Sequence, residues 1–160
     1  MEKMILVEPD KCTGCRICEM ICSFKSSNWN NFNPCQSSVR IIKVEELGVD
    51  LPVLCLHCED PLCVDVCPMG AIKKTTDGIV RLDRDLCRGC KACLMVCPYG
   101  AISLFHGEMV KCELCDGDPM CAKWCPTDAI RVIKSGSSEI PRGKKTIESL
   151  IGLVVESRQK

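Results

Sequence analysis

Cysteine is the residue type with the most chemical potential in this sequence, with 17 among 160 residues. Such a content in a short chain demands a chemical explanation. Sixteen of the 17 cysteines fall into four groups of four, which form an internal repeat. The groups are Cys12-x2-Cys15-x2-Cys18-x3-Cys22, Cys55-x2-Cys58-x4-Cys63-x3-Cys67, Cys87-x2-Cys90-x2-Cys93-x3-Cys97 and Cys112-x2-Cys115-x5-Cys121-x3-Cys125.

The cellular compartment decides whether these cysteines form disulfides or bind metal. The opening stretch MEKMILVEPDKC lacks the basic start, long apolar run and small-residue cleavage site of a signal peptide. The apolar run 150–155 is far shorter than the about 18 residues of a membrane-spanning helix. We therefore expect a cytoplasmic location and no transmembrane segment. Disulfides are disfavoured there, so the cysteines are predicted to be metal ligands.

The cysteine spacing favours iron–sulfur clusters over zinc. Groups one and three match the bacterial ferredoxin spacing for a cubane cluster, although group one has Ser23 where a proline follows the last cysteine. Structural zinc sites usually pair two Cys-x2-Cys units across a longer spacer. We rank zinc a distant second, and a disulfide framework last because no secretory signal accompanies it.

The last cysteine of each group is predicted to serve a different cluster from the first three. The three residues before it correspond to roughly one helical turn, and in two-cluster ferredoxins this fourth cysteine ligates the other cluster. In the later three groups a tail Pro-x-x-Ala-Ile follows, beginning at Pro68, Pro98 and Pro126. Gly14 and Gly89 stand where the loop needs a positive φ or close backbone approach to sulfur, with an ordinary turn as the alternative.

Three β-hairpins are expected between the cysteine groups. Asp-Gly in the middle of residues 73–82 is a strong hairpin signal. Residues 102–110 form a plausible second hairpin, and 39–44 with 49–53 a third. Short strands with one-turn helices indicate an α+β fold. Six aromatic residues are few for a conventional core, so the clusters are expected to act as the core and folding to depend on metal.

Laid end to end, the four groups resemble the four-cluster ferredoxin-type electron-transfer subunits of molybdenum and tungsten oxidoreductases. That family includes the small subunits associated with dimethyl sulfoxide reductase and formate dehydrogenase, and subunits of hydrogenase and carbon monoxide dehydrogenase systems. The resemblance covers about residues 4–134 and is most specific in 52–68 and 85–101. The short chain and the short spacer 116–120 make it similar to compact members, such as the small subunit of tungsten aldehyde oxidoreductase.

The resemblance implies four [4Fe–4S] clusters with a nested pairing of groups, one with four and two with three. Spacing alone supports exchange of the fourth ligand and leaves nested and sequential pairing open. The implied ligand sets are Cys12, Cys15, Cys18 and Cys125; Cys112, Cys115, Cys121 and Cys22; Cys55, Cys58, Cys63 and Cys97; and Cys87, Cys90, Cys93 and Cys67.

The expected fold is therefore α+β, with tandem bacterial dicluster-ferredoxin-like modules and β-hairpin insertions. We expect an outer module from residues 1–30 plus 105–134, a hairpin insertion at 31–54, an inner module at 55–104, and a linker with a C-terminal docking element at 135–160. A terminal element packed on its own domain is the alternative for that last segment.

The implied function is a non-catalytic electron-transfer subunit. Its partners are expected to be a large catalytic oxidoreductase subunit, of the molybdenum or tungsten type, and a second redox protein or flavin subunit. A free-standing polyferredoxin is the alternative, and a zinc-binding module is a more remote one. Lys and Arg together equal Asp and Glu at 21 each, so no charge excess indicates a nucleic-acid partner.

Several residues near the ligands remain open to two interpretations. Cations could tune reduction potentials, although a solvated surface charge is the simpler interpretation of each; they are Arg16, Arg88, Lys91, Lys111 and Lys123. His57 could donate a hydrogen bond to a cluster, or replace a ligand, which four thiolates per cluster make improbable. Cys35 has no ligand-spaced neighbour and is predicted to be a buried or incidental free thiol.

Overall fold

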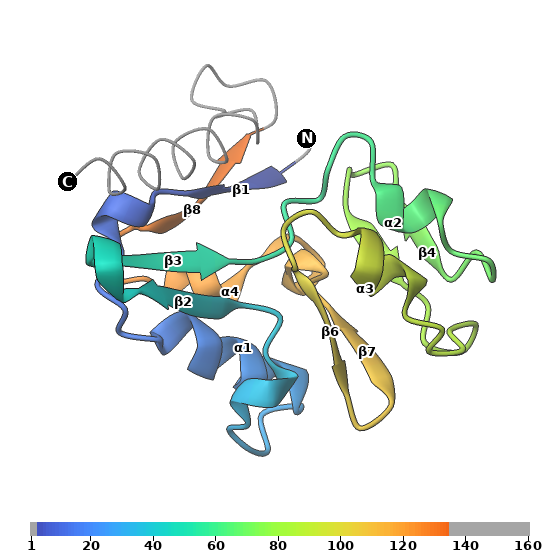
Figure 1. Ribbon diagram of the computed structural model, residues 1–160, viewed down its shortest axis with the longest axis horizontal. Coiled ribbons are helices and arrows are strands. Elements are labelled where there is room, and N and C mark those ends of the chain that lie inside the picture. Colours follow the sequence, from blue (N-terminus) through green and yellow to red (C-terminus); the bar gives the residue numbers. More distant parts are fainter. Residues whose placement is uncertain (1–2, 135–160) are drawn as a thin grey trace.

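The computed structural model describes residues 3–134, and they form short helices and two-stranded sheets (Figure 1). This confirms the expected α+β class; the segment 135–160 lies outside the described residues. The elements are β1 (Lys3–Val7), α1 (Ile17–Ser26), β2 (Arg40–Val44), β3 (Val49–Val53), α2 (Leu62–Asp65), β4 (Ile72–Lys74), β5 (Val80–Leu82), α3 (Ala92–Val96), β6 (Ile102–Phe105), β7 (Glu108–Lys111), α4 (Met120–Lys123) and β8 (Ile130–Lys134). Within residues 3–134, no helix has the length and apolar character needed to cross a bilayer.

Each sheet in the described chain pairs two antiparallel strands. Three sheets are the expected hairpins, β2–β3, β4–β5 and β6–β7. Gly78, at φ +82°, turns the chain between β4 and β5, as the Asp-Gly signal predicts. The fourth sheet pairs β1 with β8 and sets Val7 opposite Ile130. Sequence reasoning missed this sheet because its strands are far apart in the chain and no turn signal links them.

Proline sets the length of the helices. α2 and α4 have four residues each and α3 has five, and each is soon followed by a Cys-Pro pair. A residue before proline is disfavoured in the helical conformation, so these helices stop after about one turn. α1 has ten residues and continues through Cys22, because Ser23 follows that cysteine instead of proline.

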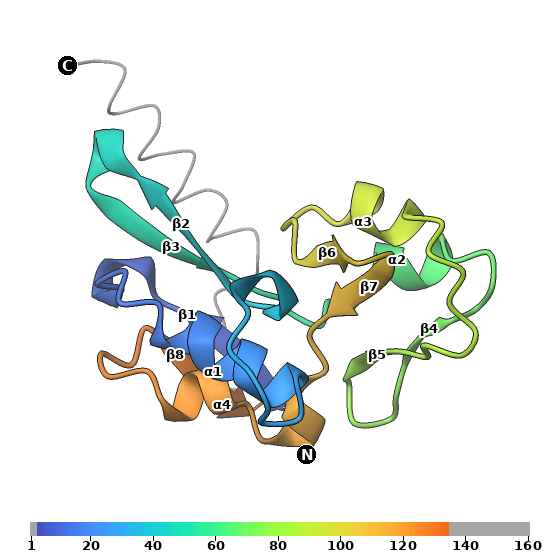
Figure 2. The same cartoon turned by 90° about the horizontal axis from the view of Figure 1, so that it is seen from below.

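The elements gather into two lobes that stand side by side in Figures 1 and 2. We call β1, α1, β2, β3, α4 and β8 the terminal lobe, and α2, β4, β5, α3, β6 and β7 the central lobe. The core of the first comprises Ile5, Cys18, Val39, Ile41, Leu54, Ile79, Leu114, Cys121 and Ile130. The core of the second comprises Ala71, Ile72, Val80, Leu82, Cys93, Ile102 and Met109.

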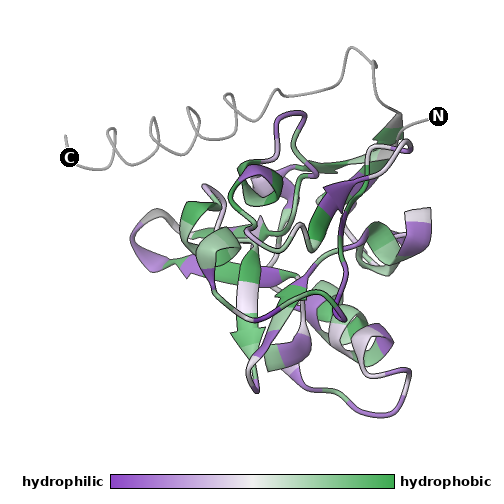
Figure 3. Ribbon diagram, turned by 90° about the vertical axis from the view of Figure 1, so that its right-hand side faces the viewer, coloured by the Kyte–Doolittle hydropathy of each residue, from purple (hydrophilic) through white to green (hydrophobic). Residues whose placement is uncertain are grey.

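A third, smaller buried group joins the two cores. It consists of Cys55, Ala101 and Cys112, with Cys97 and Tyr99 packed against it. Hydrophobic residues recur in many short segments of the ribbon (Figure 3), and the buried ones form separate groups, not one large core. Cysteines thus belong to every buried group of the described chain, which suits a protein whose interior is built around metal ligands.

Candidate metal centres

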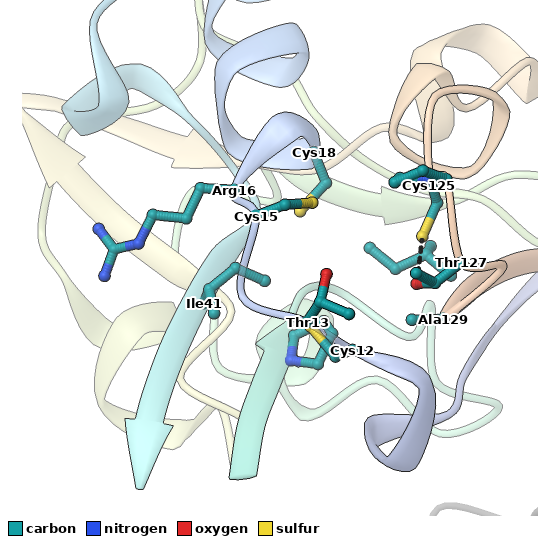
Figure 4. A pocket seen from close by; sticks show the side chains of 12 residues that line it. Cys12, Thr13, Cys15, Arg16, Cys18, Ile41, Cys125, Thr127 and Ala129 are labelled. Atoms are coloured by element: carbon teal, nitrogen blue, oxygen red, sulfur yellow. Dashed lines mark hydrogen bonds between the residues drawn. The ribbon is translucent and has the colours of Figure 1, made fainter. Parts of the chain in front are cut away.

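The first cavity is lined by the first three cysteines of group one and by the last cysteine of group four. Cys12, Cys15 and Cys18 come from the loop before α1 and from its first turn, and Cys125 follows α4. Figure 4 shows these side chains around one hollow, while the guanidinium of Arg16 points away from it. Two loops far apart in the sequence therefore bring four sulfurs together.

The central lobe holds two further cavities of the same kind. One, of about 280 Å³, is lined by Cys55, Cys58, Cys63 and Cys97 together with Tyr99. The other is lined by Cys67, Cys87, Cys90 and Cys93. In both cavities the fourth cysteine comes from the other group: Cys97, which follows α3, lines the Cys55 cavity, and Cys67, which follows α2, lines the Cys87 cavity.

The remaining four cysteines lie close to one another in the terminal lobe. The pKa of Cys112, Cys115 and Cys121 is raised by burial and further by the charge of Cys22, which places Cys22 near each of them. Burial is the larger cause of the raised pKa in each of the three. The structure thus gathers three of the nested sets around cavities and places Cys22 near the other three cysteines of the fourth.

The donor sets fit a polynuclear cluster. Thiolates are the ligands of [4Fe–4S] clusters, with one sulfur at each of four iron corners. A structural zinc ion would instead need its sulfurs at about 2.3 Å from one central point. Within residues 3–134, no three His, Cys, Asp or Glu side chains are arranged to hold a single ion. The sulfurs of the Cys55 set surround a cavity of about 280 Å³, whereas the other two lined cavities are much smaller, at about 10 Å³ each.

Burial keeps many of these thiols protonated when no metal is present. It raises the pKa of Cys18 to about 12 and that of Cys63 to about 11, because a thiolate is poorly solvated there. Burial raises the pKa of Cys112 and Cys121 as well. Metal ligation needs the thiolate, so iron binding at these positions must release protons.

The repeated Pro-x-x-Ala-Ile tail gives the fourth cysteine a cradle of backbone N–H groups. The N–H of Ala71 donates to the sulfur of Cys67 at 3.3 Å. Burial acts to raise the pKa of Cys67, but N–H groups of residues 69–72 outweigh it and leave this pKa below its ordinary value. At Cys125, burial likewise opposes N–H groups from the same tail, with a net lowering of the pKa. The hydroxyl of Thr127 lies 3.8 Å from the sulfur of Cys125.

Cys22 lacks that tail and obtains its amide from elsewhere. The N–H of Ser38, just before β2, donates to its sulfur at 3.3 Å. The β2–β3 hairpin also lines the first cavity through Ile41 and Pro52. The side chain of Glu19 accepts the N–H of Ile41 at 2.5 Å and fixes the hairpin against α1. Sequence reasoning did not identify these roles, because no spacing pattern marks them.

Gly14 and Gly89 both have the predicted positive φ, +65° and +66°. At Gly14 the backbone also approaches its neighbour closely: a Cβ there would lie 2.4 Å from a carboxylate oxygen of Asp50. At Gly89 a Cβ would lie 3.2 Å from the carbonyl oxygen of Gly107. Gly14 therefore needs both conformational freedom and space, but the neighbour that its backbone approaches is the Asp50 carboxylate and not a sulfur.

The nearby cations differ sharply in burial. Arg16 and Lys123 are about half exposed and pair with Glu19 at 3.8 Å and Asp118 at 2.5 Å. Arg88 and Lys91 line the Cys87 cavity. Lys111 is buried, and among the five its ammonium alone donates to a cysteine sulfur within the described chain, that of Cys55 at 3.5 Å. For Lys111 the interpretation as a solvated surface charge is wrong.

His57 is buried and neutral. Its Nδ1 accepts the N–H of Val80 at 3.0 Å, which leaves the proton on Nε2. Burial, with Lys111 nearby, lowers the pKa of His57 to about 3. In this tautomer neither ring nitrogen offers a free lone pair to iron, so the geometry does not favour ligation. Cys35 is an exposed free thiol, which contradicts the buried form of the prediction and agrees with an incidental free thiol.

Comparisons with known proteins find iron–sulfur domains and subunits of oxidoreductases that are similar to this chain. A family model described as "4Fe-4S dicluster domain" matches residues 48–135, and one described as "4Fe-4S binding domain" matches residues 9–25. The chain is 37% identical to a subunit of the anaerobic dimethyl sulfoxide reductase of Escherichia coli (strain K12), covering 78% of this chain and 69% of that subunit. It is 34% identical to "Aliphatic sulfonate oxidoreductase, polyferredoxin-like subunit" of Pyrococcus furiosus, covering 86% and 82%. The solved structure "Active site complex BamBC of Benzoyl Coenzyme A reductase as isolated" is 27% identical over 99% of this chain and 97% of its own, with a TM-score of 0.49.

Proposed function

This chain belongs to the 4Fe-4S dicluster family of ferredoxin-type iron–sulfur subunits of oxidoreductases, and we propose that it relays single electrons between a catalytic subunit and a second redox partner. The family match assigns [4Fe–4S] clusters to its cysteines. The observation that carries the proposal is the gathering of sixteen cysteines from four sequence groups into four spatial sets.

We propose four clusters, numbered in the order in which their ligand sets adjoin. Their ligands are Cys12, Cys15, Cys18 and Cys125 for cluster I; Cys22, Cys112, Cys115 and Cys121 for cluster II; Cys55, Cys58, Cys63 and Cys97 for cluster III; and Cys67, Cys87, Cys90 and Cys93 for cluster IV. The clusters supply one-electron oxidation and reduction when bound.

Contacts between neighbouring ligand sets support this order. Cys18 and Cys121 belong to the sets of clusters I and II, and they pack in the same terminal core. Cys55 and Cys112, from the sets of III and II, pack together between the lobes. Cys97 and Cys67, from the sets of III and IV, both pack against the central core. The sets therefore follow one another from one lobe to the other.

The chain's own residues have two tasks in this function. The thiolates hold the clusters, and backbone N–H groups such as those of Ala71 and Ser38 donate to ligand sulfurs, which stabilises the more negative, reduced state. The apolar cores shield the buried ligands from water, namely Cys18, Cys55, Cys93, Cys112 and Cys121. No side chain of the described residues is needed as a catalytic base or nucleophile, so the role proposed is non-catalytic.

The printed names of the relatives support an oxidoreductase complex as the setting. One is a subunit of an anaerobic dimethyl sulfoxide reductase, and the other is a polyferredoxin-like subunit of an aliphatic sulfonate oxidoreductase. We propose a partner catalytic subunit with a molybdenum or tungsten cofactor, and a second redox protein or flavin subunit. Gel filtration of an anaerobic native extract tests this: elution in a large complex supports it, and elution as a lone chain supports a free-standing polyferredoxin instead.

The nested ligand sets are tested by paired substitutions in the anaerobically purified chain. We expect Cys125→Ser and Cys15→Ser to alter the same electron paramagnetic resonance (EPR) signal, since both remove a ligand of cluster I. Cys22→Ser should alter a different signal, shared with Cys115→Ser. A common signal for Cys15 and Cys22 would contradict the exchange of fourth ligands.

A further inference from the structure

Lys111, the last residue of β7, is buried where the two lobes meet. Its side chain is inside the protein with only 5% of the residue exposed. The ammonium donates three hydrogen bonds, to the carbonyl oxygens of Val80 at 2.5 Å and Cys112 at 3.0 Å and to the sulfur of Cys55 at 3.5 Å. A lysine is rarely buried to this degree unless its charge is paired.

No carboxylate of the described residues balances this charge. The ion pairs of residues 3–134 involve other cations, and the two carbonyl groups that accept from Lys111 are neutral. A buried charge without a counter-charge costs several kcal/mol. The sulfur of Cys55 lies 3.5 Å from the ammonium, and it carries a negative charge when it is a thiolate ligand of a cluster.

The position of Lys111 relates it to two ligand sets at once. Cys55 and Cys112 pack in one buried group, yet they belong to different sets. The charge of Lys111 also acts to lower the pKa of Cys58 and Cys63, against the larger effect of burial. The ammonium therefore lies close to three cysteines of the cluster III set and to Cys112 of the cluster II set.

Val80 fixes the ammonium in place. Its carbonyl accepts from Lys111, and its N–H donates to Nδ1 of His57. Val80 is 1% exposed and belongs to the central core, so this peptide group has little freedom to move. His57 stays neutral and adds no second positive charge.

We propose that Lys111 is the built-in counter-charge of the junction between the lobes, and that it raises the reduction potentials of clusters II and III relative to clusters I and IV. A fixed positive charge favours the reduced, more negative state of a cluster. The two inner positions then hold electrons more readily than the two outer ones. This inference rests on the proposed function, since it presumes that the four sets hold clusters.

The test is an EPR-monitored redox titration of the full chain, purified anaerobically with its clusters. Lys111→Met removes the charge and the donors, Lys111→Gln keeps an amide donor, and Lys111→Arg keeps the charge. Lys123→Met is the matched control, because Lys123 also lies close to a ligand cysteine in the sequence but is half exposed and pairs with Asp118.

We expect Lys111→Met and Lys111→Gln to shift two of the four potentials downward. The expected shift is at least tenfold in the ratio of reduced to oxidised cluster, or about 59 mV for one electron. Lys111→Arg and Lys123→Met should leave all four within a small fraction of that shift. Unchanged potentials in a fully loaded Lys111→Gln chain would overturn the inference.

Loss of iron from the variants is also decisive. If the two neutral variants lose the clusters of the Cys55 and Cys112 sets while Lys111→Arg keeps them, the charge is required there and the inference stands. If Lys111→Arg loses them too, shape and not charge is what matters, and the inference fails. A wild-type chain without clusters would instead refute the proposed function, whatever the variants do.

Discussion

Cys22 and Cys67 hold the same place in their groups, yet they obtain their amide donors from different parts of the chain. Cys67 is followed by a proline, and the helix before it, α2, ends at Asp65. The N–H of Ala71, four residues after Cys67, donates to the Cys67 sulfur. Cys22 is followed by Ser23, α1 continues to Ser26, and the donor is Ser38. The residue that follows the cysteine therefore decides whether the N–H donor to its sulfur comes from the adjacent sequence or from a distant segment.

This difference extends to the two lobes. In the central lobe the tail after Cys67 supplies amide donors to its sulfur from the adjacent sequence, as the tail after Cys125 also does in the terminal lobe. The terminal lobe also depends on the β2–β3 hairpin, which lines part of the first cavity through Ile41 and Pro52. The N–H of Ile41 donates a hydrogen bond to the side chain of Glu19, and the Asp50 side chain lies next to Gly14. The terminal lobe is therefore expected to be more sensitive to changes in packing away from the ligands.

Removing the iron should have the largest effect, because it abolishes the core of both lobes. Cysteines belong to every buried group of residues 3–134, and few large side chains would remain to replace the clusters. We expect anaerobic chelation to eliminate the cooperative unfolding transition seen by calorimetry. A sharp transition in the iron-free chain would show that apolar packing alone suffices in at least one lobe.

Ser23→Pro should break the feature that distinguishes Cys22 from the other fourth cysteines. Proline inside α1 removes a backbone hydrogen bond and clashes with the preceding turn, at a cost of about 3 kcal/mol or more. Ser23→Ala is the control, since it loses only the hydroxyl bond to the carbonyl of Met20, worth about 1 kcal/mol. The thermal midpoints of the loaded chains measure both, and equal midpoints would contradict this role of α1.

Gly14→Ala should destabilise the chain more than Gly100→Ala. Both residues have a positive φ, which costs alanine about 1–2 kcal/mol. Only at Gly14 does the new Cβ also meet Asp50, whereas nothing lies within 4 Å at Gly100. Adding Asp50→Ala should remove the excess at Gly14, so a double-mutant cycle with no coupling would count against the close approach.

Glu8→Gln should have the smallest effect, limited to the closure of the terminal lobe by β1 and β8. Glu8 contacts Lys11 at 3.1 Å and Arg131 at 2.7 Å, and surface pairs contribute under about 1 kcal/mol. The hydrogen bond from Lys11, with help from Arg131, lowers the pKa of Glu8 against the opposing effect of burial. The stabilisation is therefore present above the ordinary carboxyl pKa and is lost as the pH falls through the lowered value. Chemical denaturation at neutral and acidic pH would show this as two curves that merge in acid.

Local signals made much of the fold predictable. The Asp-Gly turn indicated the β4–β5 hairpin, and the other two hairpins were also expected from the sequence, at residues 102–110 and at 39–44 with 49–53. Cysteine spacing identified the sulfurs and the iron–sulfur chemistry. The sheet β1–β8 was not predictable, because its strands meet only after the whole chain between them has folded.

The environment of the ligands was also beyond the reach of the sequence. In the sequence, nothing distinguishes Lys111 from the other lysines next to cysteines. Its burial results from the contact between the two lobes at Cys55 and Cys112. The β2–β3 hairpin, which lines the first cavity, contains no cysteine motif. The hydrogen bond between the Ile41 N–H and the Glu19 side chain could therefore not be predicted from the sequence. Such roles arise from tertiary packing, which a single sequence does not encode in local patterns.

Iron and acid-labile sulfide in the anaerobically purified chain, measured together with its EPR spectrum after dithionite reduction, test the central claim most directly. Four cubane clusters require about sixteen iron and about sixteen sulfide per chain, with paramagnetic signals at low temperature. A colourless chain that carries zinc, contains no labile sulfide and gives no signal after reduction would contradict the account.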